Sequence, residues 1–463
     1  MGEMFMKKLS DAADLTTGSP AKVIAMYTFP MLGSMFFQQA YNLADSWIAG
    51  NFVGADALAA VGTCYPVTVF YIAIASGLSM GTSIFCSQNF GAHKYQDVAC
   101  GMTTALFSFI PFSIVLTCIS YLFYPYMLSW LSVPAEAYEP TSIYLRIYIA
   151  GLPFLFLYNI CNGIISGLGN SRTPLLFLIF SSIFNLTLDF FLVILLDFGI
   201  VGISMTTLLA QAASAIAACI VTYRFLKRMH REQTEVRWYS KSALREILSL
   251  GIPSVCQHVF MSAGQLFLQS IINSYGMVVM AGYSVAFRIN GIVINSLMAV
   301  SNALSGYMAQ NMGAKKFRRM HQGYGICLLI SCIFSAAVIV VLRFSDTALL
   351  SVFLKDSPDK AKIIEAGQGF LRIVAPFYLL VSLKIVSDGA LRGMGAMTLF
   401  MLATLSDVVV RILFGRFFSD QWGISGVWMI WPAAWLVGTA ISFGTYLVKC
   451  RKFKNMPLNN SAE

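Results

Sequence analysis

The sequence predicts an all-α integral membrane protein, in which twelve transmembrane helices form two six-helix bundles that repeat one another. Three observations support this prediction. The 463 residues are 57% hydrophobic and only 11% charged, whereas soluble domains carry roughly 25% charged residues. Long apolar stretches recur along the chain, and each can cross a hydrocarbon core roughly 30 Å thick as a helix. Several short sequence landmarks also occur twice in the same order, as expected for an internal repeat.

The apolar stretches give six predicted spans in each half of the chain. In the first half they cover residues 23–49, 57–86, 98–123, 141–167, 174–196 and 200–223. In the second half they cover residues 247–273, 279–309, 321–343, 364–391, 397–415 and 424–448. The predicted organisation is an N-terminal segment (1–22), an N-lobe (23–223), a basic linker (224–246), a C-lobe (247–448) and a basic tail (449–463).

Lysine and arginine are unevenly distributed between alternate loops. With a cytoplasmic N-terminus, the inside loops and termini hold 21 of these residues and the outside loops hold 4. Because cytoplasmic loops of membrane proteins are rich in basic residues, we expect both termini to lie in the cytoplasm. We expect the protein itself to reside in a bacterial plasma membrane. The net charge of +10 lies in these flanking segments, which favours membrane lipid over nucleic acid as a partner.

Four landmarks carry the repeat. The paired segments are QNFGAHK (88–94) and QNMGAKK (310–316), Gly163–Gly169 and Gly389–Gly395, Gly199–Gly202 and Gly423–Gly426, and Pro30 and Pro253. An even number of spans per half gives both halves one orientation, which is a parallel repeat common among transporters. One duplicated chain can hold a complete translocation path, so we expect it to function as a monomer.

The motifs of several other protein classes are missing. The ten cysteines occur singly without a CxxC pair, and the four histidines form no HExxH motif, so a metalloenzyme site has no support. No GxxxxGK[ST] phosphate loop occurs, which argues against an ATP-driven pump. We expect no enzymatic activity, no cofactor, and no metal beyond a possible coupling Na⁺.

Acidic residues inside the predicted spans are candidate ion ligands. A charged residue at the membrane centre costs roughly 2.5–3.5 kcal/mol on insertion scales, so it usually has a function. Asp45 lies in the first span, although a place near the outer interface is the alternative. Asp189 lies in the fifth span, four residues after Asn185, so that both share a helix face. Carboxylate and amide oxygens suit Na⁺, and a desolvated carboxyl group can instead carry a proton.

A third acidic residue belongs to a different pattern. Asp388 lies in the tenth span, four residues from both Lys384 and Arg392. This spacing favours an ion pair along one helix face, so we assign Asp388 a structural role ahead of an ion-binding one.

The motifs together resemble the multidrug and toxic compound extrusion (MATE) family of cation-coupled drug antiporters. The resemblance covers nearly the whole chain. It is carried by Pro30 with Gln-Gln-x-Tyr-Asn-Leu-x-Asp in the first span, the Gln-Asn-x-Gly-Ala loop, the Gly163–Gly169 turn, the Asn185/Asp189 pair and Gly-Ala-Leu-Arg-Gly-Met-Gly in the second half.

The resemblance implies functional residues from the branch with a cation site in the N-lobe. The implied cation ligands are Asp45, Asn185, Asp189 and Thr207, with Thr206 as the neighbouring alternative. The implied substrate-cavity residues are Gln38, Tyr41, Tyr144 and Asn162. Another branch has a glutamate in the seventh span, but the corresponding stretch here contains His258 and no acid. His258 is therefore either a proton-linked substitute or an uncharged packed histidine.

These implications favour a secondary active multidrug efflux transporter, which exports organic cationic or amphipathic compounds in exchange for Na⁺ or H⁺. The expected mechanism is alternating access of the two lobes. A flippase for lipid-linked precursors is the alternative within the same superfamily, and its cavity should be basic; the spans contain few candidates for that role (Arg146, Arg288, Arg372, Lys384 and Arg411). A channel is a further alternative, which would conduct without gradient-driven exchange.

Overall fold

The computed structural model describes residues 13–48, 52–53, 55–131, 133–230, 237–354 and 358–454. Throughout these ranges the chain forms helices joined by short connections, and they contain no β-strand. The predicted all-helical fold class is confirmed. The chain divides into two compact units, each described separately below.

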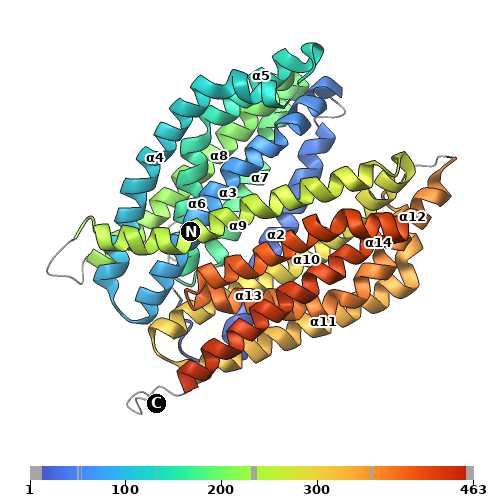
Figure 1. The fold of residues 1–463 in the computed structure, drawn as a ribbon. Coiled ribbons are helices and arrows are strands. Elements are labelled where there is room, and N and C mark those ends of the chain that lie inside the picture. The colour runs from blue at the N-terminus through green and yellow to red at the C-terminus, as the bar shows by residue number, and fades with distance from the viewer. Residues whose placement is uncertain are drawn as a thin grey trace. The chain divides into compact units, whose positions relative to one another are not determined.

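The first unit contains Met1–Asp14 and Phe29–Val255. Its helices are α3 (Ala55–Gly91), α4 (Tyr95–Trp130), α5 (Ala135–Ala150), α6 (Leu152–Gly167), α7 (Arg172–Asp189), the π-helix η2 (Phe190–Leu195) and α8 (Gly199–His230). Helix α6 is the centre of this unit, because it packs against α3, α4 and α8 (Figure 1). Helix α7 packs against α8.

The second unit contains Leu15–Thr28 and Cys256–Glu463. Its helices are α10 (Met277–Gly313), α11 (Phe317–Ser351), α12 (Lys360–Val374), the 3₁₀ turn η3 (Ala375–Phe377), α13 (Tyr378–Gly393) and α14 (Met397–Lys454). Helix α13 is central here, since it packs against α10, α11 and α14 (Figure 1). An aromatic core stabilises the unit, in which Tyr283 stacks on Trp428 and meets the edge of Phe370.

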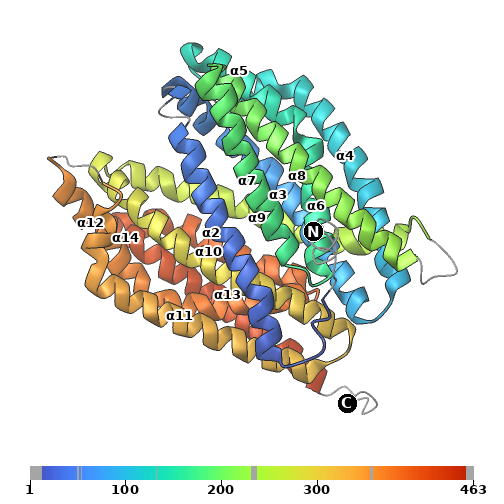
Figure 2. The same cartoon turned by 180° about the vertical axis from the view of Figure 1, so that it is seen from behind.

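The first helix of each half belongs partly to each unit. Helix α2 (Pro20–Ile48), visible along its length in Figure 2, leaves the second unit after Thr28, and α9 (Lys241–Asn273) leaves the first unit after Val255. Both helices are continuous through these boundaries. The sequence predicts the first helix of each half to lie entirely within the lobe formed by that half. Hydrophobic periodicity locates a helix, but it does not show which other helices that helix packs against.

The spans also agree with the predicted membrane architecture. Nine helices among the described residues are long and apolar enough to cross a membrane, and the pair α5–α6, bent by 46°, forms a tenth span. Helix α14 contains two predicted spans, with a break at Gly423, where φ is 58°. With α2 and the second arm of α14, the count reaches the predicted twelve.

Equivalent glycine contacts support both bundles. A Cβ atom on Gly163 of α6 would lie 2.4 Å from Ser79 Oγ of α3, and one on Gly389 of α13 would lie 2.5 Å from Ser301 Oγ of α10. Each serine also donates a 2.6 Å hydrogen bond to the same partner helix, Ser79 to the Asn159 carbonyl and Ser301 to the Ile385 carbonyl. The internal repeat therefore reproduces a close helix–helix approach that only glycine permits.

Substitution at this approach should destabilise the protein. The Cβ atom of Gly167→Ala would lie 2.6 Å from the Ser83 carbonyl oxygen, so α3 and α6 must separate at a cost of about 1–3 kcal/mol. We expect a lower melting temperature of the purified protein in detergent. The matched control is Gly325→Ala, which has no atom within 4 Å of the added methyl group and should melt as the wild type does. Equal melting of the two variants would contradict the prediction.

Candidate functional site

A group of buried polar side chains lies between α7 and α8 in the first unit. Asn185 and Asp189 are four residues apart on α7, and both are completely buried. Thr206 on α8 is also completely buried, and its hydroxyl donates to Asp189 Oδ1 at 2.5 Å. The same hydroxyl lies 2.8 Å from the Ile203 carbonyl oxygen within its own helix.

Much of the polar capacity of this group is unused. Among the residues that the structure describes, Asp189 Oδ2 and both side-chain amide atoms of Asn185 have no hydrogen-bond partner. A buried polar atom without a partner costs roughly 1–3 kcal/mol, and a charged one costs more. Two carboxylate oxygens, an amide oxygen and a hydroxyl oxygen are a suitable ligand set for a hard monovalent cation. A proton on Asp189 would also remove the buried charge.

The local backbone places these residues together. The chain changes from α-helix to π-helix directly after Asp189, and π-helical segments are frequent at functional sites. Asp197 and Gly199 then adopt positive φ angles of 51° and 52°, a conformation accessible to aspartate and easy for glycine. This tight reversal returns the chain along α7, so that Thr206 lies beside Asp189.

Helix α2 reaches the same region of the first unit. A Cβ atom on Gly33 would lie 3.5 Å from Leu175 of α7. Further along α2, Ile48 joins Val193 and Ile203 in a small buried cluster. The first span thus meets the fifth and sixth, a meeting that periodicity alone could not establish. Asp45 belongs to α2, but its side chain lies outside the part of the structure that is described.

Thr207 occupies a different environment from its neighbour. Its hydroxyl donates to the Ile203 carbonyl at 3.0 Å, and the residue lines a small pocket together with Tyr144, Tyr148 and Gln211. The threonine that contacts Asp189 is therefore Thr206, the alternative to the residue that the resemblance favoured. Tyr144 and Thr207, assigned to two different sites from the sequence, share one pocket.

The other implied cavity residues are dispersed. Gln38 is exposed, and Tyr41 and Asn162 are half-buried. Asn162 Oδ1 has no hydrogen-bond partner within the described ranges. None of these three is among the described residues that line the pocket of Tyr144.

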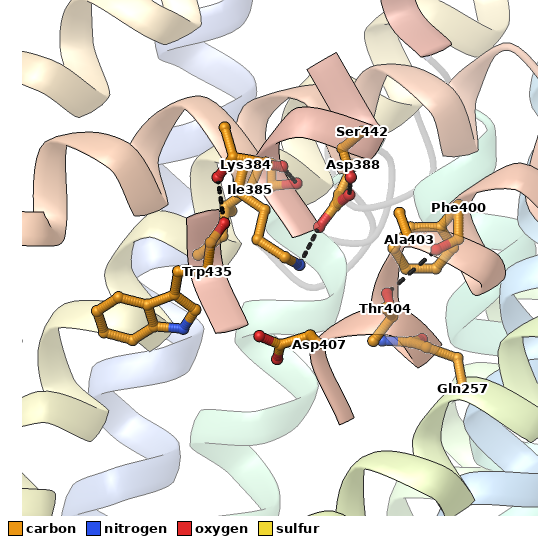
Figure 3. A network of polar contacts seen from close by, with 12 residues as sticks. Gln257, Lys384, Ile385, Asp388, Phe400, Ala403, Thr404, Asp407, Trp435 and Ser442 are labelled. Carbon is orange, nitrogen blue, oxygen red and sulfur yellow. Dashed lines mark hydrogen bonds and ion pairs between the residues drawn. The ribbon is translucent and has the colours of Figure 1, made fainter. Parts of the chain in front are cut away.

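Asp388 of the second unit forms the ion pair expected from its spacing. Lys384 Nζ lies 2.9 Å from Asp388 Oδ2, and the Ser442 hydroxyl donates to Asp388 Oδ1 at 2.5 Å (Figure 3). Arg392, the other expected partner, instead donates to Ser301 Oγ at 2.8 Å. His258 is half-buried and close enough to Arg392 for an electrostatic interaction.

A second buried ion pair was missed from the sequence. Asp407 and Arg411, four residues apart on α14, form a 3.0 Å pair with side chains that are only 6% and 10% exposed. The i,i+4 spacing of an acid and a base inside the span 397–415 was the available signal.

Comparison with known proteins identifies the family. The MatE family model matches residues 30–191 and 253–416. The chain is 26% identical to the probable multidrug resistance protein YoeA of Bacillus subtilis, over 91% of this chain and 92% of that protein. It is 21% identical to the multidrug export protein MepA of Staphylococcus aureus, over 93% and 94%.

Solved structures agree with this result. A crystal structure of MATE in the straight conformation superimposes with a TM-score of 0.85 at 25% identity, covering 95% of this chain and 98% of that one. A MOP superfamily transporter from Pyrococcus furiosus superimposes with a TM-score of 0.85 at 24% identity and the same coverage. The family model matches both halves of the chain and covers more than half of the chain's length. The chain therefore belongs to the MatE family of membrane transporters.

Proposed function

We propose that the protein is a secondary active exporter, which expels organic cationic or amphipathic compounds in exchange for Na⁺ or H⁺. The observation that carries this proposal is the buried group of Asn185, Asp189 and Thr206, in which Asp189 Oδ2 has no partner among the described residues. The names of the similar proteins YoeA and MepA support multidrug compounds as substrates.

Cation binding at this group can drive a conformational change. A ligand shifts a conformational equilibrium only by its difference in affinity for the two states. A cation or proton at Asp189 removes a buried charge, and it therefore favours the arrangement of α7, α8 and α2 that encloses the group. We infer that binding from the outside favours substrate release there, and that release to the cytoplasm resets the transporter by alternating access. Asp45 is the expected second carboxylate.

The proposal also covers the cofactor, the substrates and the location of the protein. Transport requires the coupling ion and no cofactor, and the substrates are small organic molecules that enter from the cytoplasm or the lipid. The duplicated chain works as a monomer in a bacterial plasma membrane with both termini in the cytoplasm.

The flippase alternative requires free basic groups for a phosphate. The buried cations Lys384 and Arg411 are each paired with a carboxylate, and Arg372 pairs with Asp346. Paired cations have little remaining capacity for a phosphate group. The pairing of Lys384 and Arg411 thus weakens the flippase alternative, and Arg392, which is buried and donates to Ser301 Oγ, is the buried cation among the described residues that remains for a phosphate.

Transport in proteoliposomes tests the proposal. We expect saturable movement of a fluorescent organic cation against its gradient, driven by an imposed Na⁺ gradient or by an imposed pH gradient, and no driven movement without protein. Cells that express the protein should tolerate toxic organic cations better than cells without it. Conductance that is independent of both gradients would indicate a channel. Movement of a lipid-linked phosphate without resistance to toxic cations would indicate a flippase.

A pair of adjacent threonine variants tests the ligand assignment. Thr206→Val removes the hydroxyl that donates to Asp189, and hydrogen bonds to charged groups contribute about 1.5–3 kcal/mol. For Na⁺ coupling we expect roughly a 10- to 100-fold increase in the Na⁺ concentration for half-maximal transport, because the hydroxyl oxygen is lost as a ligand and 1.4 kcal/mol corresponds to tenfold. For H⁺ coupling the half-maximal proton concentration should instead fall by a similar factor, because the ionised carboxylate loses a hydrogen bond that stabilises it. Thr207→Val is the matched control, and it should leave this cation dependence unchanged. The assignment is wrong if Thr207→Val changes the cation dependence and Thr206→Val does not.

A further inference from the structure

The second unit contains a buried group of four charges between α13 and α14. Lys384 and Asp388 lie on α13, Asp407 and Arg411 lie on α14, and each residue is less than one-tenth exposed. The two ion pairs have lengths of 2.9 and 3.0 Å. Two cations and two carboxylates sum to zero within these two pairs, and the buried Arg392 of α13, which interacts electrostatically with Asp388, adds a positive charge nearby.

Lys384 lies between the two carboxyl groups. Its ammonium is hydrogen-bonded to Asp388 and interacts electrostatically with Asp407, and Figure 3 shows the two carboxyl groups on opposite sides of it. Asp388 has a partner at each oxygen, from Lys384 and from Ser442. Asp407 Oδ1 has no hydrogen-bond partner within the described part of the chain. The ammonium thus occupies a position between buried oxygen atoms that otherwise suits a monovalent cation.

The helix opposite is shaped to admit the lysine side chain. A Cβ atom on Gly438 of α14 would lie 2.6 Å from Lys384 Cε and 3.3 Å from Lys384 Cδ. The alkyl chain of Lys384 therefore passes directly over the backbone of α14 at a glycine. Arg411 is fixed separately, because its guanidinium lies 4.0 Å from the centre of the Trp431 ring.

The repeat relates this group to the candidate site of the first unit. The glycine turns Gly163 and Gly389 are 226 residues apart, and at that offset Asn162, the residue directly before the first turn, corresponds to Asp388. The first half thus has a neutral amide where the second half has the carboxylate of Asp388. Asp189 of the first half is bonded to the Thr206 hydroxyl, whereas Asp388 is bonded to a lysine in its own helix.

We propose that Lys384 is a tethered counter-cation, which holds in the second unit the kind of position that the coupling ion occupies in the first. The proposal rests on the function proposed above. It assigns ion exchange to the group around Asp189 alone, with no external cation at Asp388 or Asp407. Removal of the lysine charge leaves Asp388 Oδ2 without its ion-pair partner, and Lys384→Met creates a new site there for a monovalent cation, either Na⁺ or a proton.

Binding to the purified protein in detergent tests this proposal without transport. All measurements use the Asp189→Asn background, so that the outcome is independent of the ion site in the first unit. With ²²Na⁺ as the probe, Lys384→Met should gain one bound ion per chain, and the additional Asp388→Asn change should remove it. If the new site takes a proton instead, Lys384→Met should gain no Na⁺ but should bind one additional proton per chain in a pH titration, again only with Asp388 present. Lys384→Arg keeps the charge and should gain neither.

Two results would overturn the proposal. One is a folded Lys384→Met protein that gains neither Na⁺ nor a proton. The other uses no lysine variant and therefore applies even if Lys384→Met fails to fold. We expect Asp388→Asn in the wild-type background to leave the number of exchanged ions per substrate unchanged. A lower ion-to-substrate ratio in Asp388→Asn would place an external ion at Asp388. Loss of transport in Asp189→Asn concerns the proposed function and leaves the binding measurements unaffected.

Discussion

Asp189→Asn is expected to abolish gradient-driven export while the protein still folds and inserts into the membrane. The substitution removes the only charge of the group formed with Asn185 and Thr206. A unit charge 4 Å from a cation contributes about 4 kcal/mol at an effective dielectric constant of 20, and desolvation offsets part of it. Because 1.4 kcal/mol is tenfold in an equilibrium constant, we expect transport under a Na⁺ or pH gradient to fall at least about 100-fold. The measurement is initial efflux from proteoliposomes, normalised to protein content.

Asp197→Asn is the matched control for this experiment. It makes the same chemical change eight residues later, at an exposed position with a positive φ angle that asparagine also adopts. Its transport and its melting temperature should equal those of the wild type. Asp45→Asn should resemble Asp189→Asn if Asp45 is the second carboxylate. Export by Asp189→Asn at the wild-type rate under both gradients would falsify the assignment of the coupling site.

The fold was predictable because lipid restricts the choice of structure. Backbone polar groups in a membrane must be satisfied internally, so each long apolar stretch had to be a helix, and the structure has helices at all twelve predicted spans. Other features depend on tertiary packing. The division of α2 at Thr28 and of α9 at Val255 cannot be read from hydrophobicity, because both helices continue without a break through these residues.

The candidate site was predictable in part for the same reason. The spacing of Asn185 and Asp189 fixes their shared face on one helix, since residues four apart lie above one another. The choice between Thr206 and Thr207 depends on the rotation of α8 against α7, because adjacent residues point about 100° apart. No pattern within α8 contains that rotation. The Asp407–Arg411 pair is a different case, because the i,i+4 spacing of an acid and a base is present in the sequence itself.

Loss of one partner of the buried Asp407–Arg411 pair should strongly destabilise the second unit. Arg411→Leu removes the 3.0 Å partner of Asp407 and the contact with the Trp431 ring. It leaves a buried carboxylate that is only partly compensated, and the loss of one partner of a buried pair costs about 3–5 kcal/mol. We expect a large decrease in melting temperature and in the monodisperse fraction during size-exclusion chromatography. Lys362→Ala is the control, because its ion pair with Asp359 is largely exposed and contributes little.

The double variant Asp407→Leu/Arg411→Leu separates the two possible causes of this loss. Replacement of a whole buried pair by apolar residues is often neutral or stabilising, so the double variant should recover most of the stability that Arg411→Leu loses. It also leaves Lys384 and Asp388 as a neutral pair. If the double variant is as unstable as Arg411→Leu, then the packing of the Arg411 side chain against Trp431, and not the uncompensated carboxylate, stabilises α14. Recovery would mean that the buried cations of the second unit serve mainly to neutralise its buried carboxylates.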